Sequence, residues 1–287
     1  MRRMKLLASI AVALCAATFA AAAPAQAAPR VAALTPFSAS TITRLGVRPV
    51  AIGQTLGGTD RYLASLRGVP VLPLSHPLGP NLEQLAARNP SIVLSSKTWH
   101  RGSAAMRRMR MRVYESDPNS VAAIGRETRA IGKVLGRTRA ANRLAAKIER
   151  DVAAAKRGIK RRPRVLVILG VGRTPYAMLA NSWGGDVVRQ AGGNLLTAGL
   201  RSPSGTARIS DEIVVKRNPD VIIAVPHGNA GNIPRLAAYY RNNPNWRNTR
   251  AVRNGRVYIS TGNSLLQPYP HVASTIRDVR RKFLKNY

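Results

Sequence analysis

The chain has 287 residues and carries 46 Lys and Arg against 12 Asp and Glu, a formal net charge of +34 at pH 7. Its length is enough for two domains of ordinary size. Cys15 is the single cysteine, which excludes an intramolecular disulfide and a multi-cysteine metal site.

A net charge of +34 is typical of nucleic-acid-binding proteins. Aromatic residues make up only 5% of the chain and do not alternate with the basic runs, which counts against a base-stacking surface. A generally Arg-rich composition, or attraction of an anionic ligand or surface, remains as the alternative.

The first 27 residues have the pattern of a secretory signal peptide. Basic residues precede an apolar, Ala-rich run over 6–23, and Ala25-Gln26-Ala27 forms an A-x-A cleavage site. We therefore expect an exported protein, periplasmic or at the cell surface, that is cleaved near Ala27 rather than held by a membrane-spanning helix. Leu14 stands before Cys15 where a lipoprotein signal needs a small residue, which disfavours lipidation of Cys15.

Residues 28–137 predict an N-terminal α/β lobe. A strand over 30–36 leads into a helix, and a β-branched strand over 92–95 opens onto the segment 96–100. A helix over 121–135 follows.

The segment from Thr138 to Ile159 predicts one uninterrupted helix. Strong helix formers dominate it, Thr138 is a candidate N-cap, and Gly158 ends it. One face is apolar at helical spacing, through Leu144, Ala145, Ile148, Val152 and Ala155. At 1.5 Å per residue the helix spans roughly 33 Å, about the diameter of a small domain. We assign 138–160 as a rod between two lobes.

Residues 161–287 predict a second lobe on the same plan. The apolar run 164–169 is typical of a strand buried on both faces of a parallel sheet, and it is expected to open onto a loop over 170–176. A strand over 221–225 and a final helix over 272–284 follow. The glycines of 170–172 lack the rest of a nucleotide-binding motif.

One short unit occurs in both lobes. Glu83 and Glu212 each stand seven residues before a proline, and each is followed by Arg-Asn-Pro, one polar residue and a β-branched run. Each unit predicts a short helix, stopped by proline, followed by a buried strand. A chance likeness between two helix-to-strand turns is the alternative.

The order of these motifs resembles that of extracytoplasmic substrate-binding proteins of ABC importers, in the group whose lobes are joined by a single long helix. That group includes receptors for ferric siderophores, vitamin B12 and haem. The matching features cover nearly all of the chain after the signal: Pro80-Asn-Leu-Glu-Gln-Leu with Asn89-Pro90, the rod helix, Gly192-Gly-Asn194, Ile209-Ser-Asp-Glu with Asn218-Pro-Asp220, and Ala251-Val-Arg-Asn-Gly-Arg-Val-Tyr258.

The resemblance implies an α/β fold of two Rossmann-like lobes joined by one long rigid helix, with the ligand in the cleft between them. It also implies that Glu83 and Glu212 dock onto arginines of the permease. A charge-assisted contact of this kind would set register as well as affinity. The alternative is that each is a first-turn glutamate favoured by the helix dipole.

Candidate cleft residues are those at strand ends: Thr35, Pro36, Trp99, His100, Arg173, Tyr176, Trp183 and His227. Trp99 would stack on a flat ligand or pack as an ordinary core aromatic. Tyr176 would ligate haem iron, as the resemblance implies, or only line the cleft. His100 and His227 would bind metal or stay solvated. Arg173, with Arg101, would pair with an anionic chelate or lie on the surface.

The sequence therefore predicts a binding protein that captures a ferric siderophore and delivers it to an ABC permease, with haem or cobalamin as the alternative. We expect a monomer with no resident cofactor, no bare-metal site and no nucleic-acid partner. An enzyme is disfavoured because no nucleophile has an adjacent base and carboxylates are few.

Overall fold

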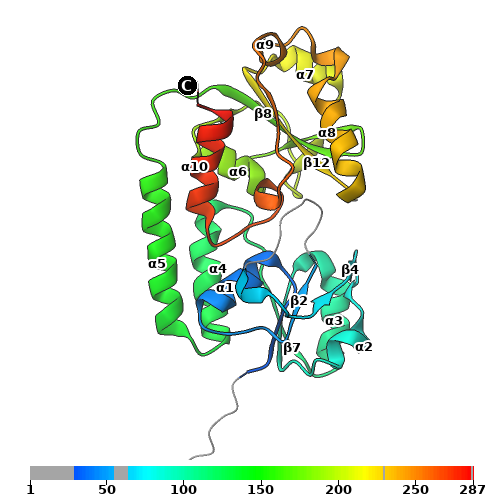
Figure 1. The fold of residues 1–287 in the computed structure, drawn as a ribbon, viewed down its shortest axis with the longest axis vertical. Coiled ribbons are helices and arrows are strands. Elements are labelled where there is room, and N and C mark those ends of the chain that lie inside the picture. The colour runs from blue at the N-terminus through cyan, green and yellow to red at the C-terminus, as the bar shows by residue number, and fades with distance from the viewer. Residues whose placement is uncertain (1–28, 55–63, 229, 286) are drawn as a thin grey trace, which may run out of the picture.

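The computed structural model describes residues 29–54, 64–228, 230–285 and 287. These residues form two α/β lobes, and helix α5 (Thr138–Ala155) runs alongside them (Figure 1). This arrangement confirms the predicted fold class. The predicted signal peptide, with Cys15, lies outside the described residues. Within the described part of the chain, no helix is both long enough and apolar enough to span a membrane.

A parallel sheet forms the centre of the N-terminal lobe, in the strand order β3-β2-β1-β6-β7. Alternate residues of β1 point to opposite faces, as a strand requires. Val31 and Ala33 join one buried cluster, whereas Ala32 joins another. The sheet is therefore covered on both sides. The strands are β1 (Val31–Ala33), β2 (Ala51–Gly53), β3 (Val71–Leu72), β6 (Ile92–Ser95) and β7 (Arg112–Glu115), with a separate hairpin of β4 (Leu74–Ser75) and β5 (Gly79–Pro80).

The helices of this lobe are α1 (Pro36–Arg44), α2 (Leu82–Ala86), α3 (His100–Arg108) and α4 (Val121–Val134). Thr35 starts α1 through a capping box, since its hydroxyl accepts from the Ser38 amide at 3.1 Å and the Ser38 hydroxyl accepts from the Thr35 amide at 3.2 Å.

A mixed sheet forms the centre of the C-terminal lobe, in the order β11-β9-β8-β12-β13, with β10 beside β8. Strands β9 and β11 are antiparallel to their neighbours and the other pairings are parallel. The strands are β8 (Arg164–Val171), β9 (Thr174–Met178), β10 (Asn194–Leu195), β11 (Thr206–Arg208), β12 (Val221–His227) and β13 (Val257–Ile259). The helices are α6 (Trp183–Gln190), α7 (Asp211–Arg217), α8 (Ile233–Arg241), α9 (Arg250–Arg253) and α10 (Val272–Phe283).

The prediction of a loop over residues 170–176 is wrong. Strand β8 continues to Val171, and Gly172 and Arg173 form a two-residue turn into β9, because Val171 pairs directly with Thr174. Gly172 adopts φ +58°, which glycine reaches without the steric cost of a side chain.

Helix α5 is shorter than predicted: it ends at Ala155 and not at Ile159. Gly158, just beyond its end, has a φ of +71°. Thr138 is its first residue and not its N-cap, a position that Arg137 occupies without a side-chain bond. Arg280 of α10 fixes the C-terminal end of α5: its guanidinium donates to the carbonyls of Ala155 and Arg157 at 2.9 Å each, and to that of Gly158 at 3.2 Å.

At its other end α5 packs tightly on α4. A Cβ on Gly132 would lie only 2.0 Å from the Cβ of Ala141, so this crossing needs a glycine. Helix α5 is therefore anchored to α4 in one lobe and to α10 in the other.

The short unit repeated in the sequence is also repeated in the structure. Glu83 and Glu212 occupy the same place, the second residue of α2 and of α7. Asn89 and Asn218 both leave these helices in the left-handed region, at φ +46° and +45°. A buried proline and then a buried strand follow each asparagine, β6 in one lobe and β12 in the other. The predicted duplication is confirmed.

Candidate ligand-binding site between the lobes

A cavity of about 410 Å³ lies between the lobes. The N-terminal lobe contributes Thr98 and residues 117–119, and the C-terminal lobe contributes the larger part of the wall. A smaller cavity of about 150 Å³ adjoins it, because both are lined by Thr98, Asp117 and residues 266–268. The cleft predicted between the lobes is present.

The cavity lies where parallel strands end. Residues 96–98 follow β6, residues 117–119 follow β7, and His227 is the last residue of β12. The carboxyl ends of parallel strands are where open α/β sheets bind ligands. Here the ends of the two sheets face each other across the cavity.

The lining of both cavities is almost uncharged. Among the described residues that line them there is no Lys or Arg, and Asp117 is the one carboxylate. Asp117 is already used, since it accepts from the Lys97 amide at 2.6 Å. Neutral hydrogen-bonding groups surround an apolar surface formed by Leu169, Met178, Trp183 and Leu266. The neutral groups in the larger cavity are Thr98, Asn119, Asn181, Ser182, Ser204, Thr206, Gln267 and His227. This arrangement suits a neutral ligand with both polar and apolar surface.

Among the described side chains of the wall, His227 has the titratable group best suited to coordinate a metal. It is half-buried, and its Nδ1 is enclosed without a hydrogen-bond partner among the described residues. Burial lowers the pKa of the imidazole below its ordinary value. The ring is therefore neutral at pH 7, the form that can coordinate a metal.

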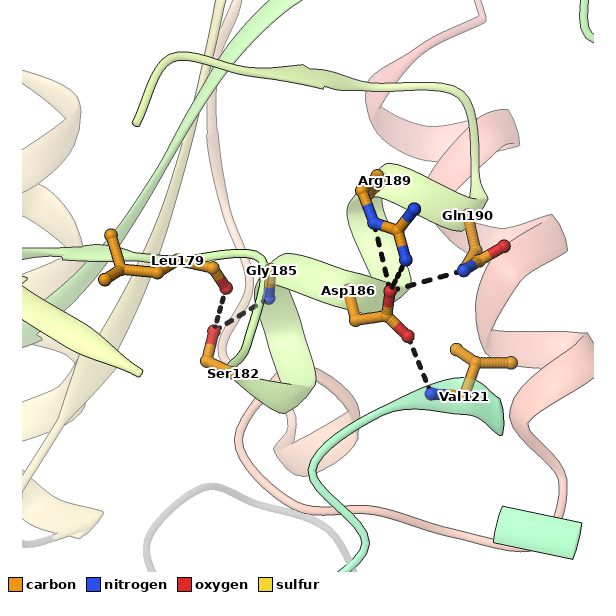
Figure 2. A network of polar contacts seen from close by, with 7 residues as sticks. All are labelled: Val121, Leu179, Ser182, Gly185, Asp186, Arg189 and Gln190. Carbon is orange, nitrogen blue, oxygen red and sulfur yellow. Dashed lines mark hydrogen bonds and ion pairs between the residues drawn. The ribbon is translucent and has the colours of Figure 1, made fainter. Parts of the chain in front are cut away.

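A buried carboxylate links helix α6 of one lobe to the start of helix α4 of the other (Figure 2). Asp186 of α6 is 1% exposed and accepts from the Val121 amide, the first residue of α4 in the other lobe, at 2.7 Å. Arg189 and Gln190 donate to its second oxygen. Helix α6 begins at Trp183 in one wall, and α4 begins just after residues 117–119 in the other. Asp186 thus holds the two walls in register.

Of the residues predicted to bind ligand, five line these cavities. Trp183 and His227 line the larger one, and Thr35, Pro36 and Trp99 line the smaller one. Trp99 is 3% exposed and packs in the core of its lobe, so the packed-aromatic alternative describes most of its surface. The Trp183 indole donates to the Ser264 carbonyl at 2.9 Å, which fixes the ring.

Three predicted residues do not line either cavity. His100 is exposed as the first residue of α3. Arg173 lies in the β8–β9 turn, with its guanidinium 5.2 Å from the Tyr239 ring centre, and Tyr176 lies within β9. The unexpected strand β9 explains the last two, because it takes a segment that was expected to open onto the cleft and pairs it into the sheet.

Sequence reasoning missed several residues of the wall: Asp117, Asn119, Asn181, Ser204 and Gln267. Residues 117–119 follow β7, a strand whose end could have been searched in the same way. Residues 203–206 and 266–268 come from connections with no motif, and only the fold brings them here.

A bare-metal site is a separate question from a chelate site. Across the described residues, no group of three or more His, Cys, Asp and Glu side chains is placed to hold a metal ion.

Comparisons with known proteins agree with this geometry. A family model described as "Periplasmic binding protein" matches residues 31–263. A cobalamin-binding protein of Halobacterium salinarum is 27% identical over 260 residues, which cover 88% of this chain and 69% of that protein. The structure of Staphylococcus aureus IsdE complexed with heme matches with a TM-score of 0.74 at 21% identity, covering 89% of this chain and 98% of IsdE. An ABC-type Fe³⁺-hydroxamate transport protein of Saccharomonospora viridis matches with a TM-score of 0.70 at 21% identity, covering 89% and 93%. The family is one of binding proteins, which agrees with the prediction against an enzyme. The chain belongs to the periplasmic binding protein family.

Proposed function

We propose that this protein is the exported receptor of an ABC importer and that it captures an electrically neutral metal chelate, a ferric siderophore of the hydroxamate type. The observation that carries the proposal is the wall of the cavity between the lobes, whose described lining holds no Lys or Arg and has Asp117 as its one carboxylate. Family membership supports the receptor role, and the wall supports the charge of the ligand.

The charge argument rests on the cost of burying an ion without a partner. An isolated charge taken out of water is strongly disfavoured unless an opposite charge meets it. Ferric catecholates are strongly anionic and haem carries two propionates, so both need cations in their sites. Arg101 and Arg173, the predicted partners for an anionic chelate, lie outside the described lining of both cavities. A neutral trihydroxamate complex needs only hydrogen bonds and apolar contact, which this wall offers.

Cobalamin is the second candidate. The relative from Halobacterium salinarum is named a cobalamin-binding protein, and its match covers 88% of this chain. A corrinoid carries neutral amide side chains, which suit the Asn, Gln, Ser and Thr side chains of the wall. Haem, the other predicted alternative, shares with cobalamin an axial metal position that a neutral His227 could fill, but its propionates have no cation in the described wall.

His227 distinguishes the two candidates. A ferric trihydroxamate has no open coordination position, so the imidazole would contribute only contact. A corrinoid whose upper ligand is water has one, so the imidazole could bind the cobalt directly.

The test is calorimetric titration of the secreted protein with ferrichrome, aquocobalamin, cyanocobalamin, haemin and a ferric tricatecholate, each repeated with His227→Ala. The proposal expects sub-micromolar, one-to-one binding of ferrichrome, changed less than about tenfold by the substitution, and no binding of the tricatecholate. Tight aquocobalamin binding that His227→Ala weakens by more than a hundredfold would move the assignment to cobalamin. Preferential binding of the tricatecholate or haemin would overturn the argument from charge.

Delivery of the chelate completes the proposal. Glu83 and Glu212 are both exposed, at equivalent positions of the two lobes, and we propose that they dock onto basic residues of the permease. Hydrogen bonding from Ser210 lowers the pKa of Glu212, which keeps it ionised. Replacing both by Gln is expected to abolish chelate uptake by whole cells while leaving chelate affinity unchanged; normal uptake would contradict the docking role.

A further inference from the structure

Each of these two glutamates lies in a surface groove, one on each lobe. The groove beside Glu83 has a volume of about 740 Å³ and is formed by the β4–β5 hairpin, the start of α2 and one face of α3. The groove beside Glu212 has a volume of about 720 Å³ and is formed by the β8–β9 turn, β11 and the start of α7. In Figure 1, α2 and α7 lie in different lobes, both away from α5.

The two grooves repeat one arrangement of charge. Arg101 and Arg108 line the groove with Glu83, and Arg173 and Arg208 line the groove with Glu212. Asp211 also lines the second groove, but its carboxylate already accepts from the side chains of Asn243, Asn245 and Trp246. All four arginines are exposed. None of them forms an ion pair or a side-chain hydrogen bond with another described residue, although Arg173 lies against the Tyr239 ring. The repeated short unit does not explain this, because Arg101, Arg108, Arg173 and Arg208 all lie outside it.

Each groove also has an apolar part, which is exposed beside Glu83 and half-buried beside Glu212. Leu78, at the tip of the β4–β5 hairpin, is 55% exposed, which makes it the most exposed of the large hydrophobic side chains in the described residues. Pro175, Leu200 and Ile213 line the other groove. An apolar surface bordered by charged groups is the usual composition of a protein–protein contact.

From this repetition we propose that the arginine pairs are docking elements in their own right, and that each groove receives a segment of the permease carrying a basic residue with neighbouring carboxylates. The inference rests on the proposed receptor function and goes beyond the glutamates. Lipid phosphates could also meet arginines. A glutamate in the same groove would repel a phosphate, however, whereas a polypeptide segment with both charges satisfies all three groups. The size of the grooves also fits a polypeptide segment better than a single headgroup.

The experiment measures the affinity of the chelate-loaded protein for lipid nanodiscs that contain the ABC permease and its ATPase. The permease is identified beforehand as the one whose gene deletion abolishes chelate uptake by the cells that make this protein. One charge reversal is made in each groove, as the double variant Arg108→Glu, Arg208→Glu. The matched control is Arg139→Glu, Arg143→Glu, which changes the net charge equally at two exposed positions of α5 that belong to neither groove. Nanodiscs of the same anionic lipid without protein form the second control.

The proposal expects the groove variant to bind the permease at least tenfold more weakly than wild type, with the α5 control within about twofold and with all three proteins binding the chelate equally. Equal losses in the groove variant and the α5 control would overturn it, since only net charge would then matter. An equal loss on protein-free nanodiscs would show that the arginines contact lipid, which also overturns it. Absence of chelate binding in wild type would instead mean that the proposed function fails.

Discussion

The two lobes share one unit and differ in almost everything around it. Helices α2 and α7 begin alike, place an exposed glutamate second, and leave through a left-handed asparagine into a buried strand. The sheets around them differ: one is wholly parallel with strands of two to four residues, and the other is mixed with strands of up to eight. The shared unit carries the two glutamates that we propose to dock onto the permease, and the regions that differ line the cavity between the lobes.

The wall of the cavity shows the same division. The C-terminal lobe provides His227, Trp183 and residues 203–206, whereas the N-terminal lobe provides Thr98 and residues 117–119. Strands β9 and β11, which have no counterpart in the N-terminal sheet, carry Met178 and Thr206 of the wall. The lobe with the more elaborate sheet therefore provides most of the wall of the cavity.

The largest expected effect concerns the contact that holds the lobes together. Replacing Asp186 by Asn removes a buried charge that caps α4 and pairs with Arg189. We expect the free energy of unfolding, measured in urea, to fall by about 3 kcal/mol. The matched control is Asp278→Asn, which breaks an ion pair of the same spacing, Asp278 with Arg281, on the exposed surface. That change should cost less than about 0.5 kcal/mol. Equal losses for the two variants would contradict a special role for the buried pair.

The next prediction separates the two copies of the shared unit. Both Asn89→Ala and Asn218→Ala place alanine in the left-handed region, which costs about 1 kcal/mol. Asn218 also accepts from the Arg250 amide at 2.8 Å, so its replacement should cost about 1 kcal/mol more. Glycine relieves the strain but not the lost bond. Asn89→Gly should therefore be nearly neutral in urea unfolding and Asn218→Gly should not, whereas equal effects would mean that the two copies are energetically the same.

A smaller effect is expected from the pH dependence of His227. Its pKa is lowered in the fold by burial, so the unfolded chain binds a proton more readily than the folded one. Stability is therefore unaffected above the unfolded pKa of about 6.5 and falls as the pH drops below it. His227→Gln should show a shallower loss of stability between about pH 7 and pH 5 in urea titrations. Identical slopes for variant and wild type would show that burial of this ring does not matter.

The smallest effect on stability is expected at the docking glutamates. Glu83 and Glu212 are exposed, so Glu83→Gln and Glu212→Gln should each leave the urea midpoint unchanged. Uptake by cells should fall more in the double variant than in either single one. A lowered midpoint would indicate that these residues serve the helices they begin and not a partner.

Much of this architecture could be predicted from the sequence, because it depends on local patterns. The rod helix, the duplicated unit and the strands over 92–95 and 221–225 follow from periodicity and from proline and asparagine at helix ends. Strand β9 was missed because a two-residue turn at Gly172 looks the same as the start of a loop. The Asp186 contact was missed because its partner, the Val121 amide, is distant in sequence. A lone carboxylate inside an apolar helix was the one signal available.

A metal chelate bound between the lobes, as proposed above, would contact both of them. Amide hydrogen exchange, measured by mass spectrometry with and without saturating ferrichrome, would reveal these contacts. We expect protection of residues 117–119 in one lobe together with 181–183, 203–206 and 266–268 in the other, and no change in α2 or α7. Protection confined to one lobe, or concentrated beside Glu83 and Glu212, would contradict the account.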